Sequence, residues 1–120
     1  MSTTEQHPQT AYKVLTSDEM AALERDGVFK GSLVDLEDGY IHLSTADQLT
    51  ATVDKHFHGQ TGLHILAVDL GAFGASLKWE EARGGTLFPH LYTDLPLNAV
   101  VAYGPLERYE DGRLKPLVTG

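Results

Sequence analysis

The chain has 120 residues, of which 42% are hydrophobic and 22% are charged, and these values are typical of one globular domain with a single core. Seventeen acidic and nine basic residues give a formal net charge of −8, which argues against a protein that follows nucleic-acid phosphates but still allows one or two arginines to hold a small anion. The chain has no cysteine, so disulfides, thiol catalysis and thiolate metal sites are excluded.

The two ends of the chain are expected to lie outside the folded domain. Residues 1–10 are polar, with neither the basic start nor the apolar core of a signal peptide. We expect a flexible N-terminus over residues 1–10, a single domain over 11–109 and a C-terminal extension over 110–120. No apolar run approaches membrane length, and we expect a cytoplasmic monomer without a membrane partner.

Two helices are predicted in the first half of the chain. Residues 16–27 combine acidic residues in the first turn with an apolar stripe, and Gly27 ends the helix. A second helix covers residues 46–57, with Ser44 or Thr45 as its N-cap, because a hydroxyl there can accept a hydrogen bond from a first-turn amide.

Strands are predicted before and between these helices. Residues 11–15 form a first strand, and residues 63–70, which are rich in branched apolar side chains, form a central one. A short strand over residues 40–44 follows an Asp-Gly turn. Residues 28–39 are predicted to be irregular or a short strand, because their apolar residues are scattered.

The second half of the chain predicts mainly antiparallel strands. Residues 77–81 and 86–92 form two strands joined by a turn with a double glycine. Pro89 cannot donate a ladder hydrogen bond, so the second of these strands is an edge strand, carries a bulge or is partly loop. Residues 98–109 give a further strand, which is expected to end at a break at Gly104-Pro105. With only two good helices, the order of elements predicts an α+β fold and disfavours a doubly wound nucleotide-binding fold.

One candidate site is a row of side chains along residues 40–44. Ile41 and Leu43 form the apolar face of this strand, so Tyr40, His42 and Ser44 share the other face. A ligand across that row would meet an aromatic ring, an imidazole and a hydroxyl, and Thr45 would add a second hydroxyl at a helix start. The alternative is a histidine on a half-exposed sheet face, bonded to a neighbouring carbonyl.

A second candidate site lies within residues 77–95, which gather aromatic, acidic and basic side chains. Alternation places Trp79 and Glu81 on one face of their strand. An aromatic cleft with an arginine at its rim would suit a flat, anionic ligand. The alternative is that Trp79 belongs to the core and Glu80 to a solvated face. The candidate residues of this stretch are Trp79, Glu80, Glu81, Arg83, His90 and Tyr92.

Other chemistries find little support in the sequence. His56 and His58 are two residues apart, so on a helix they point in different directions, and we expect no metal site. Ser44 and Ser76 lack the nucleophile elbow of a serine hydrolase, and the chain has no phosphate loop of the P-loop type.

The stretches "DGYIHLST" (38–45), "LAVDL" (66–70) and "LKWEEARGGTLFPHLY" (77–92) resemble the bacterial family called domain of unknown function 952. The resemblance covers residues 11–109. The chain differs from the usual family pattern at Thr93, where the family usually has glycine, and at Ala82, where it often has serine. It implies an ADP-ribosylation-like fold, with two small, mostly antiparallel sheets around a cleft and two main helices packed outside.

The resemblance also implies site residues. His42-Leu43-Ser44 matches an "H-x-[ST]" element that, in the histidine-containing branch of that superfamily, contacts the adenosine-side ribose of NAD. Tyr92 would correspond to the tyrosine that stacks on nicotinamide, and Glu80 or Glu81 to a catalytic glutamate.

Three hypotheses about function follow. The first is an ADP-ribosyl-transferring or NAD-related enzyme that takes NAD, ADP-ribose or a related phosphorylated ribosyl ligand. The second is a ligand-binding module that kept the cleft without the chemistry, and the third is a small interaction or structural domain. A glutamate carboxylate that faces His42 would favour the first.

Overall fold

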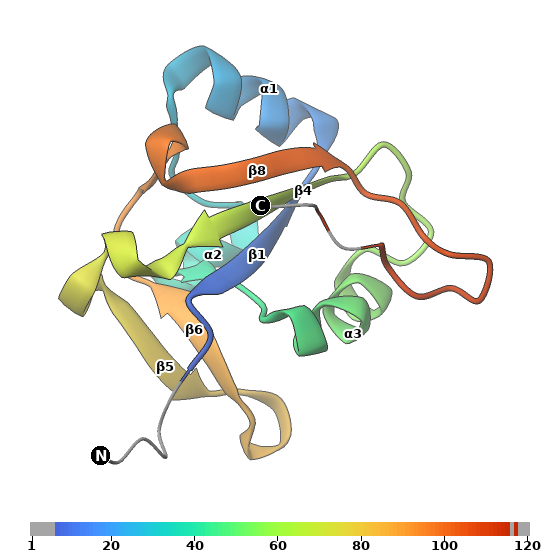
Figure 1. Ribbon diagram of the computed structural model, residues 1–120. Helices are drawn as coiled ribbons and strands as arrows, with labels where there is room; N and C mark the ends of the chain where they lie inside the picture. The colour runs from blue at the N-terminus through green and yellow to red at the C-terminus, as the bar shows by residue number, and fades with distance from the viewer. Residues whose placement is uncertain (1–6, 116, 118–120) are drawn as a thin grey trace.

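The computed structural model describes residues 7–115 and 117, and for Arg83 it describes the backbone alone. Parts of the two predicted ends, residues 1–6, 116 and 118–120, lie outside the described residues. The described part contains three α-helices and eight strands in three small antiparallel sheets (Figure 1). The helices are α1 (Ser17–Asp26), α2 (Leu33–Asp38) and α3 (Ala46–His56); the strands are β1 (Thr10–Leu15), β2 (Val28–Phe29), β3 (Ile41–His42), β4 (His64–Asp69), β5 (Leu77–Glu81), β6 (Leu87–Leu91), β7 (Leu95–Pro96) and β8 (Val100–Pro105).

The α+β class is confirmed, and so are the two predicted helices. Gly27 ends α1 in the left-handed conformation, and Thr45 is the N-cap of α3. None of the helices in residues 7–115 is long and apolar enough to cross a membrane. We expected two sheets and two main helices. The described residues also contain a third sheet, formed by β2 and β7, and a third, shorter helix, α2.

The sheet β1–β4–β8 carries a separate hydrophobic cluster on each face. β4 is its central strand, as predicted. Leu66 and Val68 lie in the larger cluster, which includes residues from α1 and from the sheet β3–β6–β5. Ile65 points to the opposite face and packs with Leu49 and Val53 of α3. The sheet is therefore covered by α3 on one side, and by α1 and a second sheet on the other.

The sheet β3–β6–β5 is built on the predicted hairpin of β5 and β6. Of the three alternatives for the strand that holds Pro89, the edge position is wrong, because β6 is the central strand, and the register of β6 with β5 shows no bulge. The carbonyl of Pro89 accepts a hydrogen bond from the Leu43 N–H, just beyond the end of β3. In an antiparallel sheet the backbone N–H and C=O of one residue point toward the same neighbouring strand. The missing N–H of Pro89 therefore falls where β3 has ended and removes no bond to β5.

Helix α2 occupies the segment predicted to be irregular or a short strand. Its apolar side chains point outward: Leu33, Val34 and Leu36 are 82%, 54% and 62% exposed. Asp35 is instead its buried residue, at 2% exposure. Ser32 and Asp35 form a capping box, in which each side chain bonds the other's backbone N–H. The helix thus forms through its cap and a buried charge, and shows no inward apolar stripe.

Replacing Gly31 with alanine is expected to lower the free energy of unfolding by about 1–3 kcal/mol. Gly31 has a φ of 128°, and an added Cβ would lie 2.9 Å from the Cβ of Asp35. Chemical denaturation measures the effect. Gly59→Ala is the matched control, because Gly59 also has a positive φ, of 78°, but nothing within 4 Å of an added Cβ. Equal losses in the two variants would show that crowding against Asp35 contributes nothing.

Candidate functional site

The side of the β3–β6–β5 sheet that faces away from the core carries a group of aromatic side chains. The strand register places His42 of β3 opposite His90 of β6, and His90 opposite Lys78 of β5. Tyr40 precedes β3 and Tyr92 follows β6, so both tyrosines lie beside this row. We call Tyr40, His42, His90 and Tyr92 the aromatic cluster.

Tyr40 lies at the centre of the aromatic cluster. Its ring is stacked on His90, with centroids 4.1 Å apart and planes 24° apart. It lies at a tilt against His42 and Tyr92, at 4.6 and 5.2 Å. The two imidazoles meet edge to face at 5.6 Å. The four rings, in or next to β3 and β6, therefore form one contacting group, in which His90 is buried at 3% exposure.

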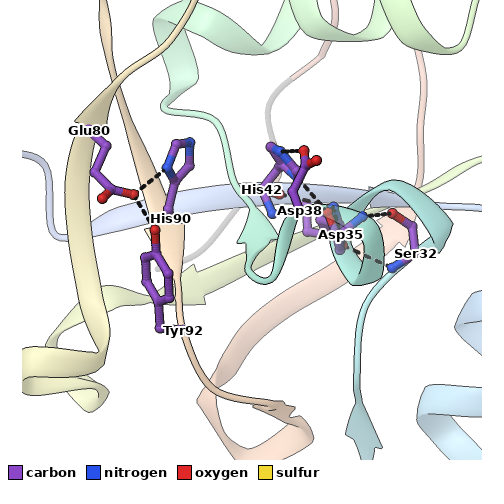
Figure 2. Close-up of polar contacts among 8 residues, drawn as sticks. Ser32, Asp35, Asp38, His42, Glu80, His90 and Tyr92 are labelled. Atoms are coloured by element: carbon purple, nitrogen blue, oxygen red, sulfur yellow. Dashed lines mark hydrogen bonds and ion pairs between the residues drawn. The ribbon is translucent and has the colours of Figure 1, made fainter.

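Glu80 of β5 holds one side of the aromatic cluster (Figure 2). Its Oε1 accepts hydrogen bonds from the hydroxyl of Tyr92, at 2.7 Å, and from Nδ1 of His90, at 2.8 Å. The bond from Tyr92, followed by that from His90, lowers the pKa of Glu80. The hydrogen bond between Tyr92 and Glu80 also raises the pKa of Tyr92 to about 12. At neutral pH the pair is thus a carboxylate and a protonated phenol, which leaves a fixed negative charge beside the rings.

His42 is held between two carboxylates of helix α2 (Figure 2). Its Nδ1 lies 2.6 Å from Oδ1 of Asp35, and its Nε2 lies 3.0 Å from Oδ2 of Asp38. An imidazole that carries a proton on both nitrogens can donate to both carboxylates at once. This arrangement fixes the orientation of the ring at the end of β3.

Asp35 in turn joins the site to the core. Lys13 of β1 places its Nζ 2.9 Å from Oδ2 of Asp35 and donates to the carbonyl of His42 at 3.0 Å. Asp35 also accepts from the backbone N–H groups of Ser32 and His42. Burial would raise the pKa of Asp35, but the hydrogen bond from His42, the charge of Lys13 and the bond from Ser32 outweigh it and hold the pKa well below its ordinary value.

Lys13 and Asp35 were missed as candidate residues from the sequence. A signal was present for Lys13, because alternation along residues 11–15 places it on the same face as Ala11 and Leu15, which are both fully buried. A lysine on a buried face requires a buried anion. The identity of that anion depends on α2, which was not predicted.

Ser44 and Thr45 lie at the start of α3 and are both buried. Ser44 Oγ is 2.9 Å from the hydroxyl of Thr52. The N–H of Thr45 bonds the side chain of Gln48, whose Nε2 donates to the carbonyl of Leu87 at 2.7 Å. The start of α3 is therefore tied to the start of β6.

Trp79 and Glu81 lie apart from the aromatic cluster. Along β5 they alternate with Lys78 and Glu80, so they occupy the other face of the strand. Trp79 packs against the core and stacks on His7 at 4.1 Å. The side chain of Arg83 lies outside the described residues; its backbone begins the turn between β5 and β6.

A pocket of about 200 Å³ adjoins the aromatic cluster, and it lies between α2 and the ends of β3 and β6. Tyr40 and Tyr92 line it, together with Leu36 and Asp94. A larger pocket, of about 430 Å³, is lined by the end of α3 and the loop that follows and includes none of the predicted site residues. In residues 7–115 and 117, no group of three or more His, Asp or Glu side chains could hold a metal ion.

Comparisons with known proteins identify the family. The model of a family described as protein of unknown function (DUF952) matches residues 14–103, which include the whole aromatic cluster. The crystal structure of protein CC0527 from Caulobacter crescentus is 43% identical, with a TM-score of 0.81 over 88% of this chain and 93% of that chain. Its solution NMR structure is 44% identical, with a TM-score of 0.76 over 88% of this chain and 90% of that one. No curated protein matches. The chain belongs to the DUF952 family.

Proposed function

We propose that the aromatic cluster binds a phosphorylated ribosyl ligand, such as NAD, ADP-ribose or a related nucleotide, in an ADP-ribosylation-like fold. The observation that carries this proposal is the contact among the rings of the aromatic cluster, two of which, His90 and Tyr92, also donate hydrogen bonds to the carboxylate of Glu80. Flat rings suit a base, and a carboxylate suits positive charge on a sugar. Both ring nitrogens of His42 are bonded to Asp35 and Asp38, so we assign this imidazole to the ring surface.

The chemistry that this arrangement supports is transfer of the ribosyl group. In such a transfer the bond between the ribosyl carbon and nicotinamide breaks, its electron pair leaves with nicotinamide, and an acceptor supplies a new pair and loses a proton. Positive charge develops on the ribosyl carbon as the bond breaks. Glu80 is the carboxylate that would stabilise this charge, because its hydrogen bonds to His90 and Tyr92 keep it ionised and fixed.

We further propose that the ligand's phosphates lie at the start of α3. The capping box of Thr45 and Gln48 occupies part of this helix end, and the remaining first-turn amides lack partners within the helix and favour an anion. The Gln48–Leu87 bond brings this helix end to β6, which follows the turn that begins at Arg83. Arg83 is the residue that we propose to contact the anion from that turn.

Addition of NAD or ADP-ribose to isotope-labelled protein is expected to shift the amide signals of residues 40–46 and 83–92. Tyr92→Ala should weaken the binding by about tenfold, because it removes one ring of the stacking surface. The matched control is Tyr103→Ala, since Tyr103 is an exposed tyrosine on β8, 48% exposed against 41% for Tyr92. Release of nicotinamide from NAD in the same sample would distinguish an enzyme from a binding module.

Two outcomes would contradict the proposal. An absence of shifts at millimolar NAD and ADP-ribose would mean that the protein does not bind these nucleotides. Equal weakening by Tyr92→Ala and Tyr103→Ala would mean that the ligand binds away from the aromatic cluster.

A further inference from the structure

Helix α2 presents an apolar face to solvent, which is unusual for a short helix beside a buried ion pair. Leu33, Val34 and Leu36 are each more than half exposed. The helix does not need these side chains for its own packing, because its inward residue is Asp35. We call Leu33, Val34 and Leu36 the α2 surface. Contiguous exposed apolar side chains of this kind are typical of interaction sites.

The α2 surface continues into the pocket beside the aromatic cluster. Leu36 belongs to both, and Tyr40, Tyr92 and Asp94 form other parts of the lining. Two aromatic rings, a carboxylate and an apolar wall suit a lysine or arginine side chain, whose stem is apolar and whose head is cationic. The ring of Tyr92 already holds a cation, since Nζ of Lys78 lies 4.8 Å from its centroid. Lys30 is the one base among the residues that line the pocket.

The charge around the α2 surface favours a basic occupant. Glu37 lies on the same helix and Asp94 lines the pocket, while Asp38 is paired with His42 and Lys30 is the base of the lining. The whole chain carries a net charge of −8. A second copy of the chain would bring the same acidic rim against this one, and like charges in contact are unfavourable. A basic segment of another protein would be attracted.

We propose that the α2 surface docks a basic, amphipathic segment of a partner protein, with its apolar side chains on Leu33, Val34 and Leu36 and one cationic side chain in the adjoining pocket. This docking goes beyond the proposed function, because it needs no nucleotide. It places a protein segment beside the aromatic cluster.

The test uses two labelled peptides and the full-length protein. One peptide is designed as an amphipathic helix, with leucine on one face and arginine on the other. The second peptide has glutamate in place of every arginine. Fluorescence anisotropy is expected to show binding of the arginine peptide only. The double variant Leu33→Ser/Leu36→Ser should weaken that binding by about tenfold or more, since apolar anchors contribute most of the energy of such contacts. Asp94→Asn should weaken it as well.

Val101→Ser is the matched control, because Val101 is 51% exposed on β8, in the other three-stranded sheet. It should bind the arginine peptide like the unmodified protein. The proposal is overturned if neither peptide binds, if both bind equally, or if the double variant binds the arginine peptide as well as the Val101→Ser control does. Sedimentation at increasing protein concentration tests whether a second copy of the chain binds the α2 surface. A dimer that forms in the unmodified protein but not in the double variant would mean that another copy, and not a basic segment, covers this surface. ADP-ribose titration of the same variant reports separately on the nucleotide site.

Discussion

Replacement of Asp35 by asparagine is expected to lower the free energy of unfolding by about 3–5 kcal/mol, the cost of breaking a buried ion pair from one side. Asp35 is 2% exposed and accepts hydrogen bonds from Lys13, His42 and Ser32. An asparagine of the same size would leave Lys13 buried without a counter-charge. It would also turn one of the two oxygens into an amide nitrogen, which cannot accept the bonds made there.

Urea denaturation at neutral pH measures this loss. Asp54→Asn is the matched control, because Asp54 also forms an ion pair, with Arg108, but on the surface. Exposed pairs contribute little, so the control should denature almost like the unmodified protein. The variant Lys13→Met in the Asp35→Asn background should recover part of the loss, since the uncompensated charge is then gone. Equal stability of Asp35→Asn and Asp54→Asn would show that the Lys13–Asp35 pair is not a structural anchor.

The success of the helix predictions depended on where each helix puts its apolar residues. Helices α1 and α3 bury an apolar stripe, with Met20 and Leu23 in one and Leu49 and Val53 in the other, and each has a capping box. Those are the features that sequence patterns detect. Helix α2 shares the capping box but puts its apolar residues outside and a carboxylate inside, so the apolar-stripe criterion rejects it. Its buried carboxylate is paired with Lys13 of β1, 22 residues away in the chain, which a local sequence window does not include.

The candidate site was only partly accessible from the sequence. Alternation grouped Tyr40 with His42, which do lie together, but it also put Ser44 in that row, and Ser44 is buried 2.9 Å from the hydroxyl of Thr52. The same local periodicity groups His90 with Tyr92. The meeting of the two groups depends on β3 pairing with β6 in a register that puts His42 opposite His90. That register is set by the packing of Ile41 and Leu91 in the core, which are far apart in the chain.

Trp79 shows the limit of reasoning from residue type. A lone tryptophan in a stretch with an arginine, a histidine and two glutamates suggested a ligand surface. The alternation rule already placed it on the face opposite Glu80, and the structure has it against the core. Face assignment within a strand was therefore more informative than the composition of the stretch.

The stability that Asp35 provides should be lost as the pH falls. Its pKa in the folded protein lies well below the ordinary value, which for an aspartate in an unfolded chain is about 4. Above that value both states are ionised, and the full stabilisation is present. Below it the unfolded chain takes up a proton while the folded protein does not, so the free energy of unfolding falls by up to about 1.4 kcal/mol for each pH unit.

Asp35→Asn removes this dependence and leaves the other carboxylates in place. The difference in free energy of unfolding between the unmodified protein and Asp35→Asn should therefore be constant from pH 7 to about pH 5 and shrink steadily below about pH 4. Urea denaturation of both proteins across this range measures the difference. Parallel curves down to about pH 2 would mean that Asp35 takes up its proton at the same pH in the folded and unfolded states. The contacts with Lys13 and His42 would then not stabilise the charged form of Asp35 over its neutral form. The anchoring of the aromatic cluster through Asp35 would need another explanation.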